Sequence, residues 1–276
     1  MIRKIHVPHL DEYLRCPLFY RYRRELGLPY LGNRGDELLL EAARHAVGAW
    51  FNALGRGLTR RKAREKVGHT LSTLWSRAGG DKTLFPLAHA RIMAVLLELD
   101  TVFNQKDDAP IAGAMIINSA VMGSLFEDVI DGLYLKNDLK TEAKRKDKVL
   151  VAVQVVSKLA ITTPRVSVMR RAMIRHAINS AMKPNPYPIK LVTLSLPDGT
   201  KKWYDLEKST YSEFIFLARS VVRHLDGAHY LPTADSSSCR VCPYRFCCTN
   251  HFCEPEVSPQ LVGRARTKLR QQGALE

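Results

Sequence analysis

One stretch near the C-terminal end decides the fold: Ser238-Cys239-Arg240-Val241-Cys242-Pro243-Tyr244-Arg245-Phe246-Cys247-Cys248. Cys239 and Cys242 stand two residues apart, and a tight turn at that spacing points both thiols toward one metal centre. Cys248 supplies a third thiol. The fourth is Cys16, far upstream, with Cys247 as the alternative. The sequence therefore predicts a four-thiolate centre that joins the two ends of the chain.

The metal in such a centre is not fixed by spacing, since four thiolates bind either zinc or an iron–sulfur cluster. A competing interpretation is a set of ordinary buried or surface thiols, and Cys253 is interpreted as a bystander. Disulfides are disfavoured because residues 1–6 lack the apolar core of a signal peptide. Reducing compartments keep thiols free.

Length and composition indicate a globular protein. The 276 residues are enough for one sizeable core with appendages or for two small domains. Apolar residues make up 46% and charged residues 25%, as in an ordinary soluble protein. No apolar run reaches the length of a membrane span, so no membrane partner and an intracellular, cytoplasmic location are expected.

The charge balance points to nucleic acid. There are 42 Lys and Arg against 27 Asp and Glu, which gives a formal charge of +15. Such an excess is typical of proteins that bind a phosphate backbone, DNA in particular. The alternatives are a generally basic solvated surface or an acidic protein partner. The candidate nucleic-acid-binding residues are Arg60, Arg61, Lys62, Arg170, Arg171 and Arg175.

Apolar periodicity predicts both helices and strands. Helices are expected over 9–26, 35–54, 58–77, 84–106, 165–182 and 209–225. Strands are expected over 114–122, 126–135 and 149–158, followed by a hairpin of 189–196 and 202–206. The apolar run at 149–158 is nearly continuous, which is typical of a strand buried on both faces.

Both ends of the chain resemble the iron–sulfur PD-(D/E)XK nucleases, a group with RecB-like exonucleases, AddB-type recombination subunits and CRISPR spacer-acquisition nucleases. Leu10 to Tyr22 resembles their opening helix, and Cys239 to Cys248 resembles their C-terminal cysteine triplet, including the Cys-Pro-Tyr step. The resemblance covers roughly residues 1–50 and 225–253. It implies a [4Fe–4S] cluster, with zinc as the alternative, held by Cys16, Cys239, Cys242 and Cys248.

The same resemblance implies a fold of the α+β or α/β class. Its PD-(D/E)XK restriction-endonuclease-like core is a mixed sheet flanked by helices, with a helical insertion and a cluster segment packed on the N-terminal helix. The implied division is an N-terminal helix over 1–34, a helical region over 35–110, the nuclease-like core over 111–226, the iron–sulfur segment over 227–256 and a basic tail over 257–276.

The catalytic positions that the resemblance implies are incomplete. The family pattern is an Asp on one strand and Asp/Glu-x-Lys on the next, which bind Mg²⁺ or Mn²⁺. His45 and Asp131 match family positions. On the second strand, Gln154 or Val156 stands at the acidic position, with Val156 or Lys158 at the lysine position. Neither register gives an acid two residues before a lysine, so these positions are interpreted as vestigial.

Two further observations bear on activity. A displaced ligand from Glu142, Glu127 or Asp128 could replace the missing acid. The Gln-x-x-x-Tyr pair that helps the family hold DNA is absent from residues 165–176.

The predicted function is therefore a nucleic-acid-binding pseudo-nuclease. It would be a non-catalytic subunit of a DNA replication, recombination or repair complex, beside a helicase, polymerase or nuclease subunit. One alternative is an active Mg²⁺- or Mn²⁺-dependent DNA exonuclease with a rearranged site. Another is an assembly factor that does not bind nucleic acid.

Overall fold

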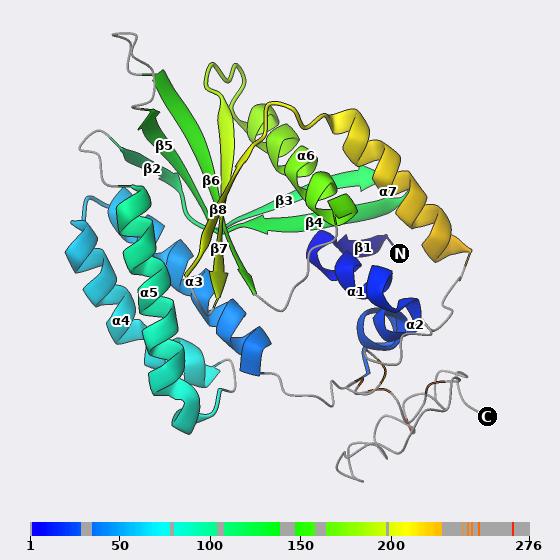
Figure 1. The fold of residues 1–276 in the computed structure, drawn as a ribbon, viewed down its shortest axis with the longest axis horizontal. Helices are drawn as coiled ribbons and strands as arrows, with labels where there is room; N and C mark the ends of the chain where they lie inside the picture. Colours follow the sequence, from blue (N-terminus) through cyan, green and yellow to red (C-terminus); the bar gives the residue numbers. More distant parts are fainter. Residues whose placement is uncertain are drawn as a thin grey trace.

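The chain folds into a mixed α+β structure, which confirms the predicted class at that level (Figure 1). The computed structural model describes residues 2–28, 35–77, 80–103, 108–138, 147–157, 164–196 and 199–227, together with Cys239, Cys242, Tyr244, Cys248 and Thr267. Among the described helices, none is long and apolar enough to cross a membrane.

Two sheets form the centre of the described structure. One has the strand order β2-β5-β6-β7-β8, and the other has the order β1-β4-β3. The pairs β6–β7 and β1–β4 are parallel, and the remaining pairs are antiparallel. The bounds are β1 Arg3–His6, β2 Ala109–Ala112, β3 Met115–Val121, β4 Ser124–Ile130, β5 Gly132–Asp138, β6 Asp147–Ser157, β7 Ile189–Leu196 and β8 Lys201–Asp205.

Helices cover both faces of the five-stranded sheet (Figure 1). Helices α3, α4 and α5 lie on one face and α6 lies on the other, whereas α7 packs against α6 and strand β3 of the three-stranded sheet. Their bounds are α1 Leu10–Arg15, α2 Pro17–Tyr20, α3 Gly35–Gly55, α4 Arg60–Arg77, α5 Phe85–Val102, α6 Pro164–Ala181 and α7 Tyr211–Asp226, with short turns η1 Val7–His9, η2 Arg21–Glu25 and η3 Lys82–Leu84.

Strand β6 lies between two hydrophobic cores. Val151 and Val153 join the core under α3, α4 and α5, whereas Leu150 and Ala152 join the core under α6 and α7. Successive side chains of a strand point to opposite faces, so an apolar residue is needed at nearly every position. The prediction of a strand buried on both faces is confirmed.

The segment 126–135, predicted as one strand, is two strands in different sheets. In β4, Ile130 pairs with Met115, and in β5, Gly132 pairs with Val153. Asp131 lies at the bend between them, and its N–H donates to the carbonyl of Val153 at 2.8 Å. The apolar pattern runs on through the bend, because both sides of it are buried, and therefore hides the boundary.

The predicted N-terminal helix over 9–26 is interrupted at Cys16. This residue is extended, with φ −156° and ψ 106°, and Pro17 begins α2 immediately after it. A proline ring excludes the helical conformation from the residue before it, which explains the break. The helix is therefore divided into α1 and α2 at this cysteine.

Two short strands were not predicted. Strands β1 and β2 span four residues each, too few for an alternating pattern to stand out. Strand β2 also contains Pro110, a residue that strands accept mainly at sheet edges, and β2 is an edge strand.

Candidate metal centre and the acidic site in the sheet

Three of the four predicted cysteines lie against one small apolar cluster. Cys16, Cys242 and Cys248 pack on Leu18, Tyr22, Leu28 and Tyr244. The cluster therefore joins residues 16–28 to the cysteine segment, across more than two hundred positions of sequence. None of Cys16, Cys239, Cys242 and Cys248 is in a disulfide.

Tyr244 anchors the cysteine segment. Its side chain is 1% exposed, and its ring contacts Phe19 and Tyr22 edge-on, with centroids 5.4 and 5.8 Å away. Its hydroxyl donates a hydrogen bond to the carbonyl of Leu28 at 3.3 Å. A buried tyrosine needs such a partner, and this bond fixes the segment on the N-terminal helices.

The thiols also influence one another electrostatically. The pKa of Cys242 is raised to about 11, chiefly by burial and also by negative charge on Cys16, Cys248 and Cys239, against a lowering hydrogen bond from the backbone at Tyr244. A thiolate in this place therefore calls for a compensating cation. Three thiols packed on an apolar cluster, with Cys239 next to Cys242 as the fourth, are the kind of donor that zinc and iron–sulfur clusters use.

The thiols lie in the same region but do not form a complete coordination sphere. Over the described residues, no group of three or more His, Cys, Asp or Glu side chains is spaced to hold a metal ion. Cys247 and Cys253 lie outside the described residues. The fit to a metal centre thus rests on the proximity and chemistry of the four thiols.

The second candidate site surrounds Asp131, which is fully buried. One carboxylate oxygen, Oδ2, accepts a hydrogen bond from the backbone N–H of Val155 at 2.6 Å. The carboxylate thus continues the hydrogen-bond ladder at the point where the chain bends out of the sheet. The other oxygen, Oδ1, is buried without a hydrogen bond among the described residues.

A cation from helix α3 lies beside this carboxylate. The Nε of Arg44 is 3.9 Å from Oδ1 of Asp131, and Nε and Nη2 both donate to the carbonyl of Val155 at 3.4 Å. Arg44 thereby supplies positive charge at the carboxylate. Burial raises the pKa of Asp131 to about 6, against the lowering effects of Arg44 and of the Val155 N–H.

The sequence predicted a site role for His45 and none for its neighbour Arg44. A usable signal was present, because Leu40, Arg44, Gly48 and Phe51 follow helical spacing along one stripe of α3. An arginine on an apolar stripe needs a buried partner. The side chain of His45 is 64% exposed and lies 3.9 Å from Glu41.

Asp128, considered as a replacement ligand, is already paired. Its carboxylate accepts hydrogen bonds from Nε and Nη2 of Arg170 at 2.8 and 3.2 Å. Asp128 is 2% exposed and Arg170 is 7% exposed. The pair is therefore internal, and it corrects two expectations: Arg170 does not offer its guanidinium to a nucleic acid at the surface, and Asp128 is not available to a metal.

The remaining candidates for the missing acid do not complete the site. Glu127 lies 3.3 Å from Lys4 and 3.7 Å from His6, and Glu142 falls outside the described residues. Gln154 is 1% exposed, and its amide donates to the carbonyl of Val129 at 2.6 Å. Lys158 also falls outside the described residues.

The described residues do not fit a magnesium site. Mg²⁺ requires several oxygen ligands with compensating negative charge. Within the described part of the chain, Asp131 offers one oxygen without a hydrogen bond, and the nearby Asp128 carboxylate is neutralised by Arg170. The charge that a metal would supply beside Asp131 comes from Arg44.

The other basic candidates occupy different surroundings. On α4, Lys62 is exposed, and Arg61 is exposed and paired with Glu65 at 2.9 Å. The guanidinium of Arg171 lies over the ring of Tyr204, 5.1 Å from its centroid. Two further residues are tied to neighbours, since Arg175 bonds Ser209 and Glu207, and Arg60 interacts with Tyr134.

Comparison with known proteins gives little to add to this geometry. No family of known proteins and no curated protein matches the chain. One similar solved structure is described as the crystal structure of SSO0001. It shares 11% identity and a TM-score of 0.38, over 91% of this chain and 88% of that chain. A similarity at that TM-score supports no conclusion about fold or function.

Proposed function

We propose that this protein is a catalytically inactive, nucleic-acid-binding member of the iron–sulfur PD-(D/E)XK group. The observation that carries the proposal is the state of the acidic site. Asp131 is fully buried, bonded to the Val155 N–H and neighboured by the Arg44 guanidinium. A nuclease of this kind needs that carboxylate to hold a cation against a phosphate.

The chemistry of the site supports this proposal. A phosphate approaching Asp131 would need an open, cation-loaded carboxylate, whereas this carboxylate is inside the sheet. In either register of the family pattern the second acid is missing, because its position is taken by Val156 or by Gln154, whose neutral amide donates to the carbonyl of Val129. The pair Asp128–Arg170 next to it neutralises another carboxylate internally.

We further propose that Cys16, Cys239, Cys242 and Cys248 hold a [4Fe–4S] cluster, with zinc as the alternative. Support comes from the packing of three of these residues, Cys16, Cys242 and Cys248, on one apolar cluster. The cluster would compensate the charge of four thiolates and fasten the cysteine segment to α1 and α2.

Nucleic-acid binding is supported by the formal charge of +15. Among the predicted contact residues, Arg61 and Lys62 lie exposed on α4. In this role the protein would serve as a binding subunit in a DNA replication, recombination or repair complex, beside an active helicase, polymerase or nuclease.

The test combines a cleavage assay with a binding assay. Purified protein is incubated with single-stranded and end-bearing duplex DNA in Mg²⁺ and in Mn²⁺, beside Asp131→Ala. We expect no cleavage by either protein. Cleavage that Asp131→Ala abolishes would instead establish an active exonuclease with a rearranged site.

Binding is measured by gel shift over a salt titration. The double variant Arg61→Gln with Lys62→Gln should lower the slope of log K against log salt by about 2, roughly one unit for each phosphate contact. Lys208→Gln, another exposed position, is the matched control and should leave the slope unchanged. If no nucleic acid binds in a salt-dependent way, the role of a protein-assembly factor replaces the proposal.

A further inference from the structure

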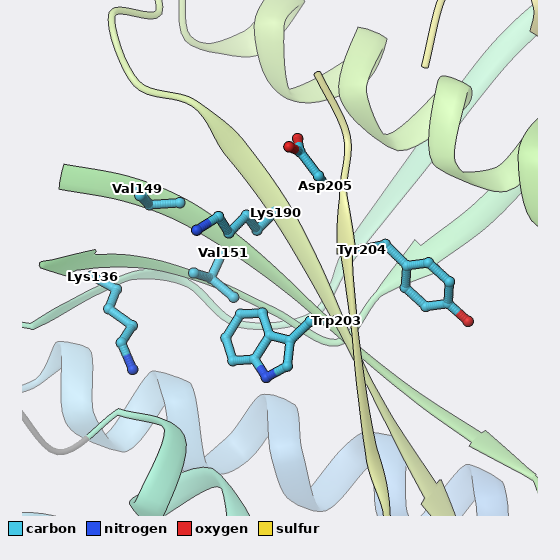
Figure 2. A pocket seen from close by; sticks show the side chains of 7 residues that line it. All are labelled: Lys136, Val149, Val151, Lys190, Trp203, Tyr204 and Asp205. Carbon is cyan, nitrogen blue, oxygen red and sulfur yellow. The ribbon is translucent and has the colours of Figure 1, made fainter. Parts of the chain in front are cut away.

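A cavity on the α5 side of the five-stranded sheet is separate from both sites described above. It has a volume of about 440 Å³ and is formed by strands β5, β6, β7 and β8 (Figure 2). Its lining residues are Lys136, Val149, Val151, Lys190, Trp203, Tyr204 and Asp205. Known small-ligand cavities have volumes of about 300–1,000 Å³, so a ligand of nucleotide size fits.

The cavity has an apolar floor and one aromatic wall. Val149 and Val151 are 3% and 1% exposed and close the floor. Trp203, on the edge strand β8, is 40% exposed, and its indole points over Val151, whereas the ring of Tyr204 points to the opposite side of the sheet (Figure 2). A large apolar ring left partly in water beside a concave floor is a surface suited to stacking with a flat partner.

Two ammonium groups give the cavity a positive edge. Lys136 and Lys190 line it, opposed by the single carboxylate of Asp205. The ammonium of Lys136 donates to the carbonyl of Val102 at the end of α5, which fixes its position. A lysine ammonium has three N–H donors, so it can hold a carbonyl and an anion together. The indole and the two lysines therefore line the same cavity.

We propose that this cavity binds one nucleotide of a single-stranded nucleic acid, with the base stacked on Trp203 and the adjoining phosphate held by Lys136 and Lys190. The proposal rests on the nucleic-acid binding proposed above and specifies its form. In a duplex, bases are stacked on their neighbours and paired, so their faces are not available to the indole. The cavity therefore selects single strands over duplexes.

The indole itself reports the test. The chain has three tryptophans, and the other two, Trp50 and Trp75, are 0% and 4% exposed. Base stacking on Trp203 should quench intrinsic fluorescence when an oligothymidylate of about 10 nucleotides is added, and should shield the residue from acrylamide. A duplex of equal length should bind with little quenching.

Substitution separates stacking from charge attraction. Trp203→Ala should weaken oligothymidylate binding by between about five-fold and about 150-fold, the range that loss of one stacked base produces. Trp203→Phe keeps a ring and should retain most of the affinity while losing the quenching signal. Phe216→Ala removes an aromatic ring that is 74% exposed on α7, and as the matched control it should change neither.

The outcomes distinguish this inference from the proposed function. If no oligonucleotide binds in a salt-dependent way, both fall. If single strands bind but Trp203→Ala, shown to be folded by circular dichroism, binds as well as the unaltered protein, only the cavity assignment is overturned. Quenching of Trp203 by duplex and single strand alike would also overturn it.

Discussion

The carboxylate of Asp131 is fully buried, which disfavours its ionised form. Burial raises its pKa from an ordinary 3.8 to about 6, although Arg44 and the Val155 N–H both favour the ionised form. The native state therefore binds this proton more tightly than the unfolded state does. Stability from this residue is present below pH 3.8 and is lost as the pH rises through about 6.

This pH dependence should disappear in Asp131→Asn. The amide keeps the shape of the side chain and an oxygen for the Val155 N–H, but does not titrate. Between pH 4 and 7, the free energy of unfolding of the unaltered protein should fall relative to the variant by up to about 3 kcal/mol. Urea unfolding at several pH values measures it. Parallel curves for the two proteins would contradict the burial of an ionised carboxylate.

The Asp128–Arg170 pair should behave as a unit. Removing one partner leaves an isolated buried charge, so Asp128→Asn or Arg170→Met should each reduce the free energy of unfolding by about 3–5 kcal/mol. The double variant leaves no unpaired charge and should be more stable than the sum of the single effects predicts. Denaturant unfolding of all four proteins gives the coupling energy, and strictly additive effects would show that the two side chains do not interact.

At the scale of elements, the contact of α3 with β5 depends on a glycine. A Cβ added to Gly132 would lie 2.2 Å from Cε2 of Phe51. Gly132→Ala should force the helix or the ring to move, which costs about 1–3 kcal/mol of stability. Gly55→Ala is the matched control, because a Cβ at Gly55 meets nothing within 4 Å. Thermal unfolding compares them, and equal melting temperatures would mean that Phe51 adjusts freely.

Elements with a strong local pattern could be predicted from the sequence. Helices α3 to α7 follow apolar periodicity because each presents a continuous apolar face to a core. Strands β6 and β7 are recognisable as apolar runs because they are buried on both faces of the sheet. The change of sheet at Asp131 could not be predicted, since buried apolar residues continue on both sides of the bend. Strands β1 and β2 owe their conformation to pairing with distant strands.

The candidate sites also contain features that could be predicted from the sequence and features that could not. The approach of Cys16 to Cys242 and Cys248 could be predicted from the resemblance of both chain ends to one family, whereas local turn spacing concerns only Cys239 and Cys242. The partners of Asp131 and Asp128 could not, because Arg44 and Arg170 reach them from helices that are distant in sequence. Only tertiary packing decides which arginine lies inside and which faces water.

At the scale of the whole molecule, the apolar cluster around Cys16, Cys242 and Cys248 joins segments from opposite ends of the chain. If the proposed metal centre is present, Cys16→Ser should abolish stoichiometric metal and lower the melting temperature, because metal binding is coupled to folding. Anaerobic purification with iron, sulfide and zinc analysis measures the first effect, and scanning calorimetry measures the second.

Cys253→Ser is the control for this prediction and should retain both metal and stability. A visible absorbance band with iron and sulfide would identify a cluster, and stoichiometric zinc would identify the alternative. Equal metal content in the Cys16→Ser variant and the unaltered protein would remove Cys16 from the ligand set.

The position of Arg44 has a consequence for the protein inside a living cell. The positive charge beside Asp131 belongs to the polypeptide, so it is present from the moment the chain folds and does not follow the supply of free ions. Starvation for divalent ions, or a sudden influx of them, would leave this part of the molecule in the same electrostatic state. The structure around Asp131 would then stay the same while ion-dependent enzymes in the same cell gain or lose activity.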